Sequence, residues 1–398
     1  MAAEDRLERP QRWASAHLHY HDALDDLLRS GVRPLIDELA AHGLIEKLFF
    51  VRHWQGGQHV RLRILLCDEL GEEAVKRLIE ALIGRFFTAC PSQTIVRAED
   101  YLQAAGWLCQ HEFGHRKVTI EPLQPNNSIR YVPYVPEYDR LGGSAGVAAI
   151  EPHFIDSSVI ALDLIAANLS GQRRTGQALT MMLLAAAALI PDLERLTRFF
   201  QDRYRGWAAK LVTGDRARYE RYENQFGQHY VRQRLVVQTG SSVDCEGVRG
   251  DAPDRCEGAT APASQGEALR AGRAVYWLPS SDPQRREVGC RRSRMPRVFP
   301  RGPLELDDLV RRLLDDIWRG AGNGLDTTNE RWMASIAALR DLLIRLQRSD
   351  RRLALEPLLF QCLHQHNNRL GVAMTEEVYL LFLLQRTLTE IAEGKNTQ

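Results

Sequence analysis

The chain has 398 residues, of which 44% are hydrophobic and 26% are charged, as is usual for a folded globular protein. Its net charge of +1 at pH 7 gives no indication of a nucleic-acid or membrane-surface partner. The 7 cysteines have long spacings and no CxxC pair, so neither a disulfide framework nor a zinc knuckle is indicated. The N-terminus lacks the apolar segment of a secretory signal, and we expect a cytoplasmic protein without a membrane span.

The first third of the chain predicts strands and helices packed together. Residues 22–41 have leucines at helical spacing, interrupted by a glycine and a proline. Residues 48–54 and 59–66 are strand-like and flank the turn sequence QGGQ, which is typical of a β-hairpin. Residues 72–88 have the pattern of an amphipathic helix. This order of elements indicates an α+β fold with a mainly antiparallel sheet and packed helices.

The middle of the chain is mostly helical in pattern. Residues 117–136 begin as a strand and continue as a proline-punctuated loop. Residues 154–167 and 177–200 have helical periodicity, and residues 201–238 are expected to add a helix with a polar face. The most apolar stretch, 178–190, is too short to span a bilayer and predicts a buried helix.

The composition divides the chain into three parts. Residues 1–238 form the α+β part, and residues 304–398 form a helical part that completes the same domain. Between them, residues 239–303 are rich in Gly, Pro and then Arg, which predicts a flexible linker or long loop. The arginines between 285 and 301 could contact tRNA or an acidic peptide leader, but a solvated loop is favoured because the overall charge is balanced.

Arg61 and Arg63 are the first candidate site residues. They lie two residues apart on the second predicted strand, so both side chains point to one face of the sheet. Two adjacent guanidinium groups repel each other unless an anion lies near both. The pair therefore indicates either a carboxylate or phosphate clamp, or a solvated sheet face with ordinary salt bridges.

The segment YVPEYDRLGG gives a second candidate pair, Glu137 and Arg140. Pro136 can begin a short helix, and three-residue spacing then puts the two charged side chains on one side. The glycines that follow allow a close backbone approach or an anion-binding turn. An ordinary surface ion pair followed by a helix stop is the alternative interpretation.

His364 is the third candidate, in the helical segment CLHQHNNRLGV. His364 and His366 diverge by about 200° on a helix, so one of them is expected to face a site and the other solvent. A histidine can transfer a proton near neutral pH, although many such histidines only make a hydrogen bond in the core.

Metal and cofactor sites are not expected. His17, His19 and His21 would align on a strand, but no acidic or cysteine partner has diagnostic spacing. The sequence has no phosphate-binding P-loop, no GxGxxG after a strand and no GxSxG elbow.

Three segments, taken in order, resemble one known family. The run from Trp13 through VRPLIDEL, LFFVRH and HVRLRI resembles the start of the lantibiotic dehydratase C-terminal, or thiopeptide-type bacteriocin biosynthesis, domain. The segments YVPEYDRLGG and EPHFIDSS are similar to the central motif of that family, and HQHNNRLG is similar to its terminal motif. The resemblance spans nearly the whole chain, and three motifs in order are more specific than any one alone.

The resemblance implies a reaction and its partners. In the family, a partner domain attaches glutamate from glutamyl-tRNA to Ser or Thr of a ribosomally made precursor peptide. The domain resembled here then expels glutamate by β-elimination, which leaves dehydroalanine or dehydrobutyrine. This chain would be a stand-alone member that acts with a separate glutamylating dehydratase. Direct nucleic-acid binding is not expected, and a homodimer is expected only by analogy with the family.

The same resemblance assigns roles to the five candidate residues. The arginine pair of the family maps onto Arg61 and Arg63, its acidic residue and third arginine onto Glu137 and Arg140, and its histidine onto His364. The arginines would hold the glutamyl carboxylates as negative charge develops on the leaving group. His364 would take or return a proton, and Glu137 would orient an arginine or the glutamyl amine. The identity of the base is left open.

Two other functions are compatible with the sequence. One is the pyridine synthase branch of the family, which joins two dehydroalanines in a formal [4+2] cycloaddition and ejects the leader peptide. Retention of the arginines favours elimination over that branch. The other is a non-catalytic scaffold, in which an exposed strand edge of the hairpin at residues 49–66 accepts the leader peptide by β-augmentation.

Overall fold

The structure is a computed structural model, and it describes residues 13–67, 71–113, 118–169, 171–212, 326–349 and 355–393. The linker predicted for residues 239–303, its arginine cluster and the first part of the predicted helical region from residue 304 lie outside the described residues. The predicted division into three parts therefore stays a prediction.

Four antiparallel strands form one sheet in the order β2-β3-β1-β4. The strands are β1 (Trp13–His19), β2 (Ile45–His53), β3 (His59–Leu66) and β4 (Ser128–Tyr131). The predicted hairpin is confirmed as β2 and β3. Its turn places Gly56 and Gly57 at φ of +86° and +95°, which a side chain would disfavour. The predicted α+β class with a mainly antiparallel sheet is confirmed.

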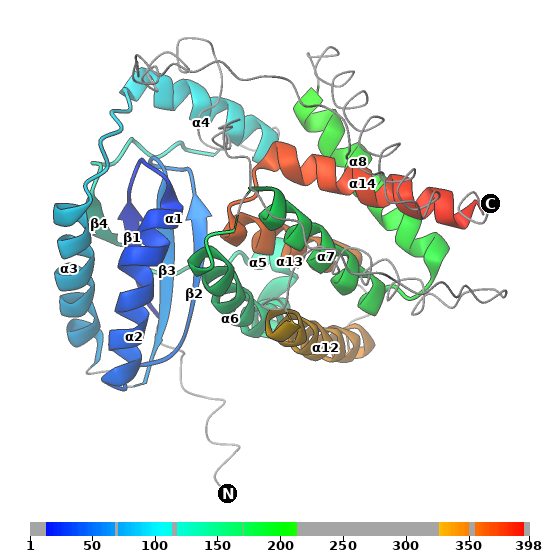
Figure 1. The fold of residues 1–398 in the computed structure, drawn as a ribbon, viewed down its shortest axis with the longest axis horizontal. Coiled ribbons are helices and arrows are strands. Elements are labelled where there is room, and N and C mark those ends of the chain that lie inside the picture. Colours follow the sequence, from blue (N-terminus) through cyan, green and yellow to red (C-terminus); the bar gives the residue numbers. More distant parts are fainter. Residues whose placement is uncertain are drawn as a thin grey trace, which may run out of the picture.

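Helices cover the apolar face of the sheet (Figure 1). They are α1 (Leu24–Leu27), a π-helical turn (Leu28–Val32), α2 (Arg33–Ala41) and α3 (Gly71–Ala89). Alternate residues of the central strands, among them Leu18, Leu62 and Ile64, are buried beneath them. The predicted interruption of the first helix is a π-helical turn that contains Gly31 and ends just before Pro34.

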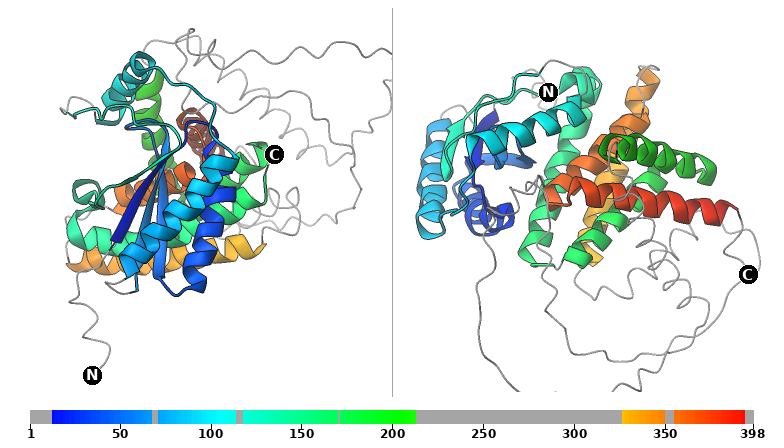
Figure 2. Two further views of the ribbon diagram at one scale, coloured as in Figure 1. Left: turned by 90° about the vertical axis from the view of Figure 1, so that its left-hand side faces the viewer. Right: turned by 90° about the horizontal axis from the view of Figure 1, so that it is seen from above.

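Most of the helices from α6 onward form a bundle beside the sheet (Figures 1 and 2). Its long helices are α6 (Gly143–Ala166), α7 (Gly171–Leu189), α8 (Leu193–Val212), α12 (Asp326–Ser349), α13 (Leu355–Leu370) and α14 (Met374–Ala392). The helical run predicted for 177–200 is two helices, because Pro191 separates α7 from α8. One continuous apolar core joins the sheet to this bundle.

Strand β1 was not predicted, and two further segments depart from the sequence prediction. Residues 118–127 contain no strand, and β4 begins only at Ser128. The helix α4 (Ala98–Phe113) was not predicted.

Helix α6 has the length and apolar composition of a membrane-spanning helix. However, 67% of its most apolar 18-residue stretch is buried inside the protein, as in a core helix.

Side chains of the bundle cover the outer edge of β2. Ser158 Oγ accepts a hydrogen bond from the backbone N–H of Phe50 at 3.1 Å, and Arg369 Nε donates to the Phe50 carbonyl at 2.8 Å. Asn368 bonds the backbone of Arg52 in the same way. Strand β3 lies inside the sheet, so no open edge remains along Phe50–Arg52 for the peptide augmentation considered above.

Candidate functional site

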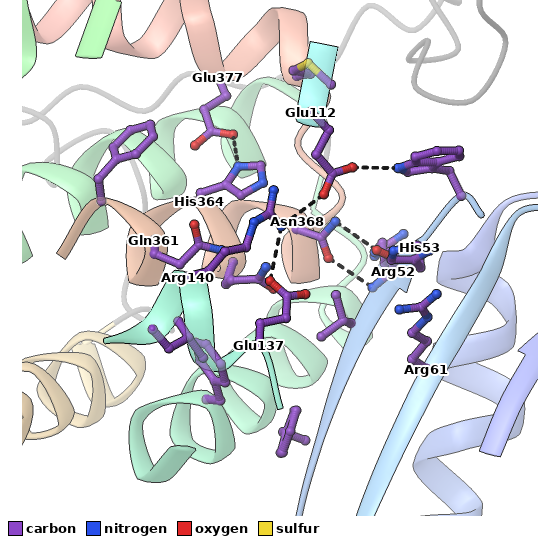
Figure 3. Close-up of a pocket in the computed structure, with 18 of the residues that line it drawn as sticks. Arg52, His53, Arg61, Glu112, Glu137, Arg140, Gln361, His364, Asn368 and Glu377 are labelled. Carbon is purple, nitrogen blue, oxygen red and sulfur yellow. Dashed lines mark hydrogen bonds and ion pairs between the residues drawn. The ribbon is translucent and has the colours of Figure 1, made fainter. Parts of the chain in front are cut away.

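A cavity of about 420 Å³ lies where the sheet meets the helical bundle (Figure 3). Its walls come from β2, β3, α4, α5 (Tyr138–Leu141), α8, α13 and α14. All five residues predicted from the sequence line it: Arg61, Arg63, Glu137, Arg140 and His364. Segments about 300 residues apart in the chain thus form one concave site, the usual form of a small-molecule or peptide-side-chain pocket.

The register of the strands brings polar side chains together on the sheet face toward the cavity. Arg61 pairs with Val51 of β2 on one side and with His17 of β1 on the other. Arg63 lies in the adjacent row, opposite Phe49 and Ser15. Since side chains two apart on a strand share a face, both guanidinium groups project to the cavity side of the sheet.

Arg61 and Arg63 have no carboxylate in ion-pair contact within the described parts of the chain. Arg61 Nε bonds His59 Nε2 at 3.2 Å, and Arg63 bonds Ser15 Oγ and His17 Nε2 at 2.5 and 3.3 Å. Burial lowers the pKa of both guanidinium groups, and the charge of Arg61 adds to the lowering for Arg63, to about 10. Two adjacent positive charges, Arg63 buried and Arg61 half-buried, without a carboxylate in ion-pair contact favour the binding of a carboxylate.

Arg140 faces the cavity from α5 and is held by two acidic side chains. Its Nη1 lies 3.1 Å from Glu137 Oε2 and 3.0 Å from Glu112 Oε1. Burial lowers the pKa of Arg140, but the two carboxylates outweigh burial and the net shift is upward. The predicted i,i+3 pair therefore forms, at a cavity wall, and Arg140 is a cation fixed in place. Glu137 precedes α5, and Gly142 ends this short helix at φ +77°.

His364 and Glu377 form a pair on the helical wall of the cavity (Figure 3). His364 Nδ1 lies 2.8 Å from Glu377 Oε2, and Glu377 is 1% exposed. Burial lowers the pKa of His364, but the charge and hydrogen bond of Glu377 outweigh it, so the pKa lies above 6.5. A carboxylate that holds Nδ1 leaves Nε2 as the nitrogen able to take a proton.

His366 does not face solvent, which corrects the prediction for the second histidine. It is 1% exposed, and its Nδ1 lies 2.8 Å from Ser157 Oγ in the core. Its ring packs 4.3 Å from that of Trp332. The two histidines do point to different sides of α13, as predicted. The side of His366 does not face solvent, because other helices of the bundle pack against it, and the local sequence pattern does not show this packing.

Several lining residues were missed by the sequence analysis. Glu112 joins the site through Arg140 and through the indole N–H of Trp54, which donates to it at 3.0 Å. Tyr134 lies beneath the Arg63 guanidinium, 5.3 Å from its ring centroid. Glu377 offered one available signal, an acidic residue on an otherwise apolar helical face.

The alternating histidines lie on the polar face of the sheet. His17 and His19 are on β1, and both stack on His59, with ring centroids at 4.9 and 4.5 Å. No group of three histidine, cysteine or acidic side chains suited to a metal ion occurs within the described residues. Burial, with neighbouring positive charges, lowers the pKa of His17 to about 2 and of His19 to about 3, so these rings are neutral at pH 7.

Comparison with known proteins gives a family match and a set of similar structures. The sequence profile described as "Lantibiotic biosynthesis dehydratase C-term" matches residues 13–388. The pyridine synthase TbtD from thiomuracin biosynthesis is 18% identical, with a TM-score of 0.60 over 96% of this chain and 99% of that one. No curated protein matches the sequence.

Two further solved structures are similar to this chain at lower scores. The tRNA-dependent lantibiotic dehydratase MibB from Microbispora sp. 107891 is 17% identical, with a TM-score of 0.47 over 97% of this chain and 29% of that one. TsrL is also 17% identical, with a TM-score of 0.47 over 97% and 96% of the two chains.

Proposed function

Because the chain belongs to the lantibiotic biosynthesis dehydratase C-terminal family, we propose that its cavity removes glutamate from glutamylated Ser or Thr of a ribosomally made peptide. One observation carries the proposal. Arg61, Arg63 and Arg140 line a single cavity together with His364. The expelled glutamate is a dicarboxylate, and guanidinium groups are the side chains best suited to bind carboxylates in a defined orientation.

The proposed reaction is a β-elimination that proceeds without a cofactor. A base removes the proton from Cα of the glutamylated residue, and the Cα–Cβ double bond forms. The bond from Cβ to the ester oxygen breaks, and its electron pair leaves on the carboxylate of glutamate. The products are one glutamate and one dehydroalanine or dehydrobutyrine.

His364 is the proposed base. Glu377 holds its Nδ1, so Nε2 of the neutral ring is the nitrogen that accepts the Cα proton. Arg140, fixed by Glu137 and Glu112, stabilises the negative charge that develops on the leaving carboxylate. Arg61 and Arg63 hold the second carboxylate from the sheet side. The cavity thus has cations on the sheet wall and a proton acceptor on the helical wall.

The test uses the whole protein and a glutamylated precursor peptide. Mass spectrometry is expected to show loss of glutamate with wild-type protein, and accumulation of glutamylated peptide with Arg61→Ala and Arg140→Ala. Arg77→Ala is the control, because Arg77 is exposed on α3 and does not line the cavity. Full activity in the Arg61→Ala variant, or no glutamate loss with the wild type, would overturn the proposal.

A second candidate function has one specific observation in its favour. The pyridine synthase TbtD is similar in fold over nearly the full length of both chains. Under that function, a fully dehydrated peptide would be cyclised and its leader released. Incubation of the protein with a dehydrated peptide, followed by mass analysis of the leader, separates the two functions.

The partners follow from the proposed reaction. The substrate would be a precursor peptide modified beforehand by a separate glutamylating dehydratase, and the tRNA would contact only that enzyme. A lyase that acts on newly made peptides would work in the cytoplasm. Assembly as a homodimer belongs to the same proposal, and light scattering of the purified protein tests it.

A further inference from the structure

The two guanidinium groups on β3 are held by different atoms. Arg61 is held through Nε, which donates to His59 Nε2. Arg63 is held through both terminal nitrogens, Nη1 to Ser15 and Nη2 to His17. Its guanidinium plane also lies over the ring of Tyr134. Among the described residues, Arg61 therefore keeps all four of its terminal N–H donors for a ligand, whereas Arg63 already uses one N–H of each terminal nitrogen on the protein.

A hydrogen bond to the turn sets the tautomer of His59. Its Nδ1 lies 2.7 Å from the carbonyl oxygen of Gly57, an atom that can only accept. Nδ1 therefore has the hydrogen, and Nε2 of the neutral ring has a lone pair. Arginine can only donate, so the 3.2 Å contact from Arg61 Nε is the matching hydrogen bond.

We infer that His59 is a positioning residue that orients Arg61 as the main carboxylate fork of the cavity, while His17 and Ser15 hold Arg63 as a supporting charge. This inference rests on the proposed function, in which a carboxylate binds here. An arginine held at Nε presents its two terminal N–H groups in parallel, the geometry that pairs with both oxygens of one carboxylate. Without the hydrogen bond to His59, the Arg61 side chain would populate several rotamers, and only some of them would have this orientation.

The surroundings of His59 favour the neutral ring that the inference requires. His59 is fully buried, and burial together with nearby positive charge holds its pKa well below 6.5. The charged and titratable groups that face it come from the three strands β1, β2 and β3: His17, His19, His53 and Arg61. A second proton on His59 would remove its acceptor and repel Arg61.

Two substitutions of His59 separate orientation from packing. His59→Gln places an amide oxygen near the position of Nε2, so it keeps an acceptor for Arg61, whereas His59→Leu fills space without one. The matched control is His19→Leu, because His19 is 1% exposed, stacks on His59 and bonds neither arginine. Its ring nitrogens have no hydrogen-bond partner within the described residues.

Steady-state kinetics on the glutamylated peptide give the first readout. His59→Leu is expected to raise KM about tenfold with a smaller change in kcat, since a lost charge-assisted hydrogen bond changes affinity by about this factor. His59→Gln and His19→Leu are expected to stay within about threefold of the wild-type KM. Equal defects in His59→Leu and His19→Leu would overturn the inference, because packing alone would then explain both.

The second readout needs no turnover. Nitrogen-15 NMR of the wild-type protein is expected to show His59 as the Nδ1–H tautomer, and calorimetry is expected to show weaker binding of free glutamate to His59→Leu than to His19→Leu. The Nε2–H tautomer, or equal glutamate binding by the two variants, would refute the positioning role. Failure of the proposed elimination would instead leave the tautomer in place and appear only as absent glutamate loss with wild-type protein.

Discussion

The side-chain amide of Asn368 pairs with the main chain of Arg52 as a neighbouring strand would. Asn368 Oδ1 accepts from the Arg52 N–H at 2.9 Å, and Asn368 Nδ2 donates to the Arg52 carbonyl at 3.0 Å. The two residues are 316 positions apart in the chain. One side chain on α13 thus satisfies both backbone groups at the edge of β2, beside the cavity.

Replacement of Asn368 by alanine is expected to lower the free energy of unfolding by about 2 kcal/mol, because two partly buried backbone groups lose their partners. Urea unfolding followed by circular dichroism measures the loss. Asn368→Asp keeps the acceptor but places a carboxylate oxygen against the Arg52 carbonyl, so a loss at least as large as that of alanine is expected. Gln103→Ala, an exposed change on α4, is the control and should stay within about 0.5 kcal/mol. A loss no larger for Asn368→Ala than for Gln103→Ala contradicts the pairing.

Removal of the charge of Glu377 should shift the pH dependence of turnover. Glu377 raises the pKa of His364, and the base form of His364 appears as the pH rises through that pKa. In Glu377→Gln, burial still lowers the pKa of His364 but the carboxylate no longer raises it. The acidic limb of the kcat profile therefore moves to lower pH. The plateau falls roughly tenfold because the base is weaker. Glu376→Gln is the neighbouring control, since Glu376 accepts from the Ala373 N–H and has no contact with His364 among the described residues. An unmoved acidic limb would rule out His364 as the titrating base.

The buried histidines should make the protein sensitive to acid. Burial lowers the pKa of His17 to about 2 and of His19 to about 3, against 6.5 for an exposed histidine. At a pH between the folded-state pKa and 6.5, these histidines are protonated in the unfolded chain but not in the folded protein. The free energy of unfolding therefore falls as the pH drops below 6.5. At pH 5 each ring costs about 2 kcal/mol relative to pH 7. Urea unfolding of His19→Leu at both pH values should show about 2 kcal/mol less acid loss than wild type, and an equal loss would contradict the prediction.

Gly371→Ala should destabilise the fold more than Gly43→Ala. Both glycines follow a helix at positive φ, +77° and +64°. A Cβ at Gly43 meets nothing within 4 Å, whereas one at Gly371 would lie 2.9 Å from Cζ of Arg52. Arg52 is 6% exposed and paired with Asp25 at 2.5 Å, so it cannot easily move. We expect losses of about 1 kcal/mol for Gly43→Ala and about 3 kcal/mol for Gly371→Ala in thermal or urea unfolding. Similar losses would show that Arg52 can shift.

Lysine substitutions should distinguish Arg61 from Arg63. Arg61→Lys removes the fork but keeps the charge, so a rise in KM of about tenfold is expected with little change in stability. Arg63→Lys cannot bond Ser15 and His17 together while lying over Tyr134, and about 2 kcal/mol of unfolding free energy should be lost. Peptide kinetics and urea unfolding measure the two effects. The opposite pattern would assign the fork to Arg63.

The sequence predicted the elements whose signals are local. The hairpin β2–β3 and the helix α3 follow from side-chain alternation, a glycine turn and helical spacing within about 20 residues. Strand β1 was missed, although His17 and His19 were recognised as alternating. Its cavity-side positions are histidine and serine, so it lacks the hydrophobic character expected of a central strand.

The candidate site was predicted in its residues but not in its architecture. Resemblance to a family indicated the five residues, and the structure brings them to one cavity. Glu377 has a local signal in its apolar helix, but its contact with His364 and that of Glu112 with Arg140 could not be inferred, because each contact joins helices whose packing depends on the whole core. The same limit applies to Asn368, whose position near the end of α13 does not reveal that its side chain lies against the sheet.

The covered edge of β2 has a consequence for synthesis on the ribosome. The sheet and its helices can condense while the chain is still growing, but the wall that contains His364 and Asn368 arrives only with α13. Until then, Phe50 and Arg52 expose backbone groups that another nascent chain could pair with. Between translation of residue 53 and of residue 370, this edge of β2 therefore lacks the side chains that cover it in the folded protein.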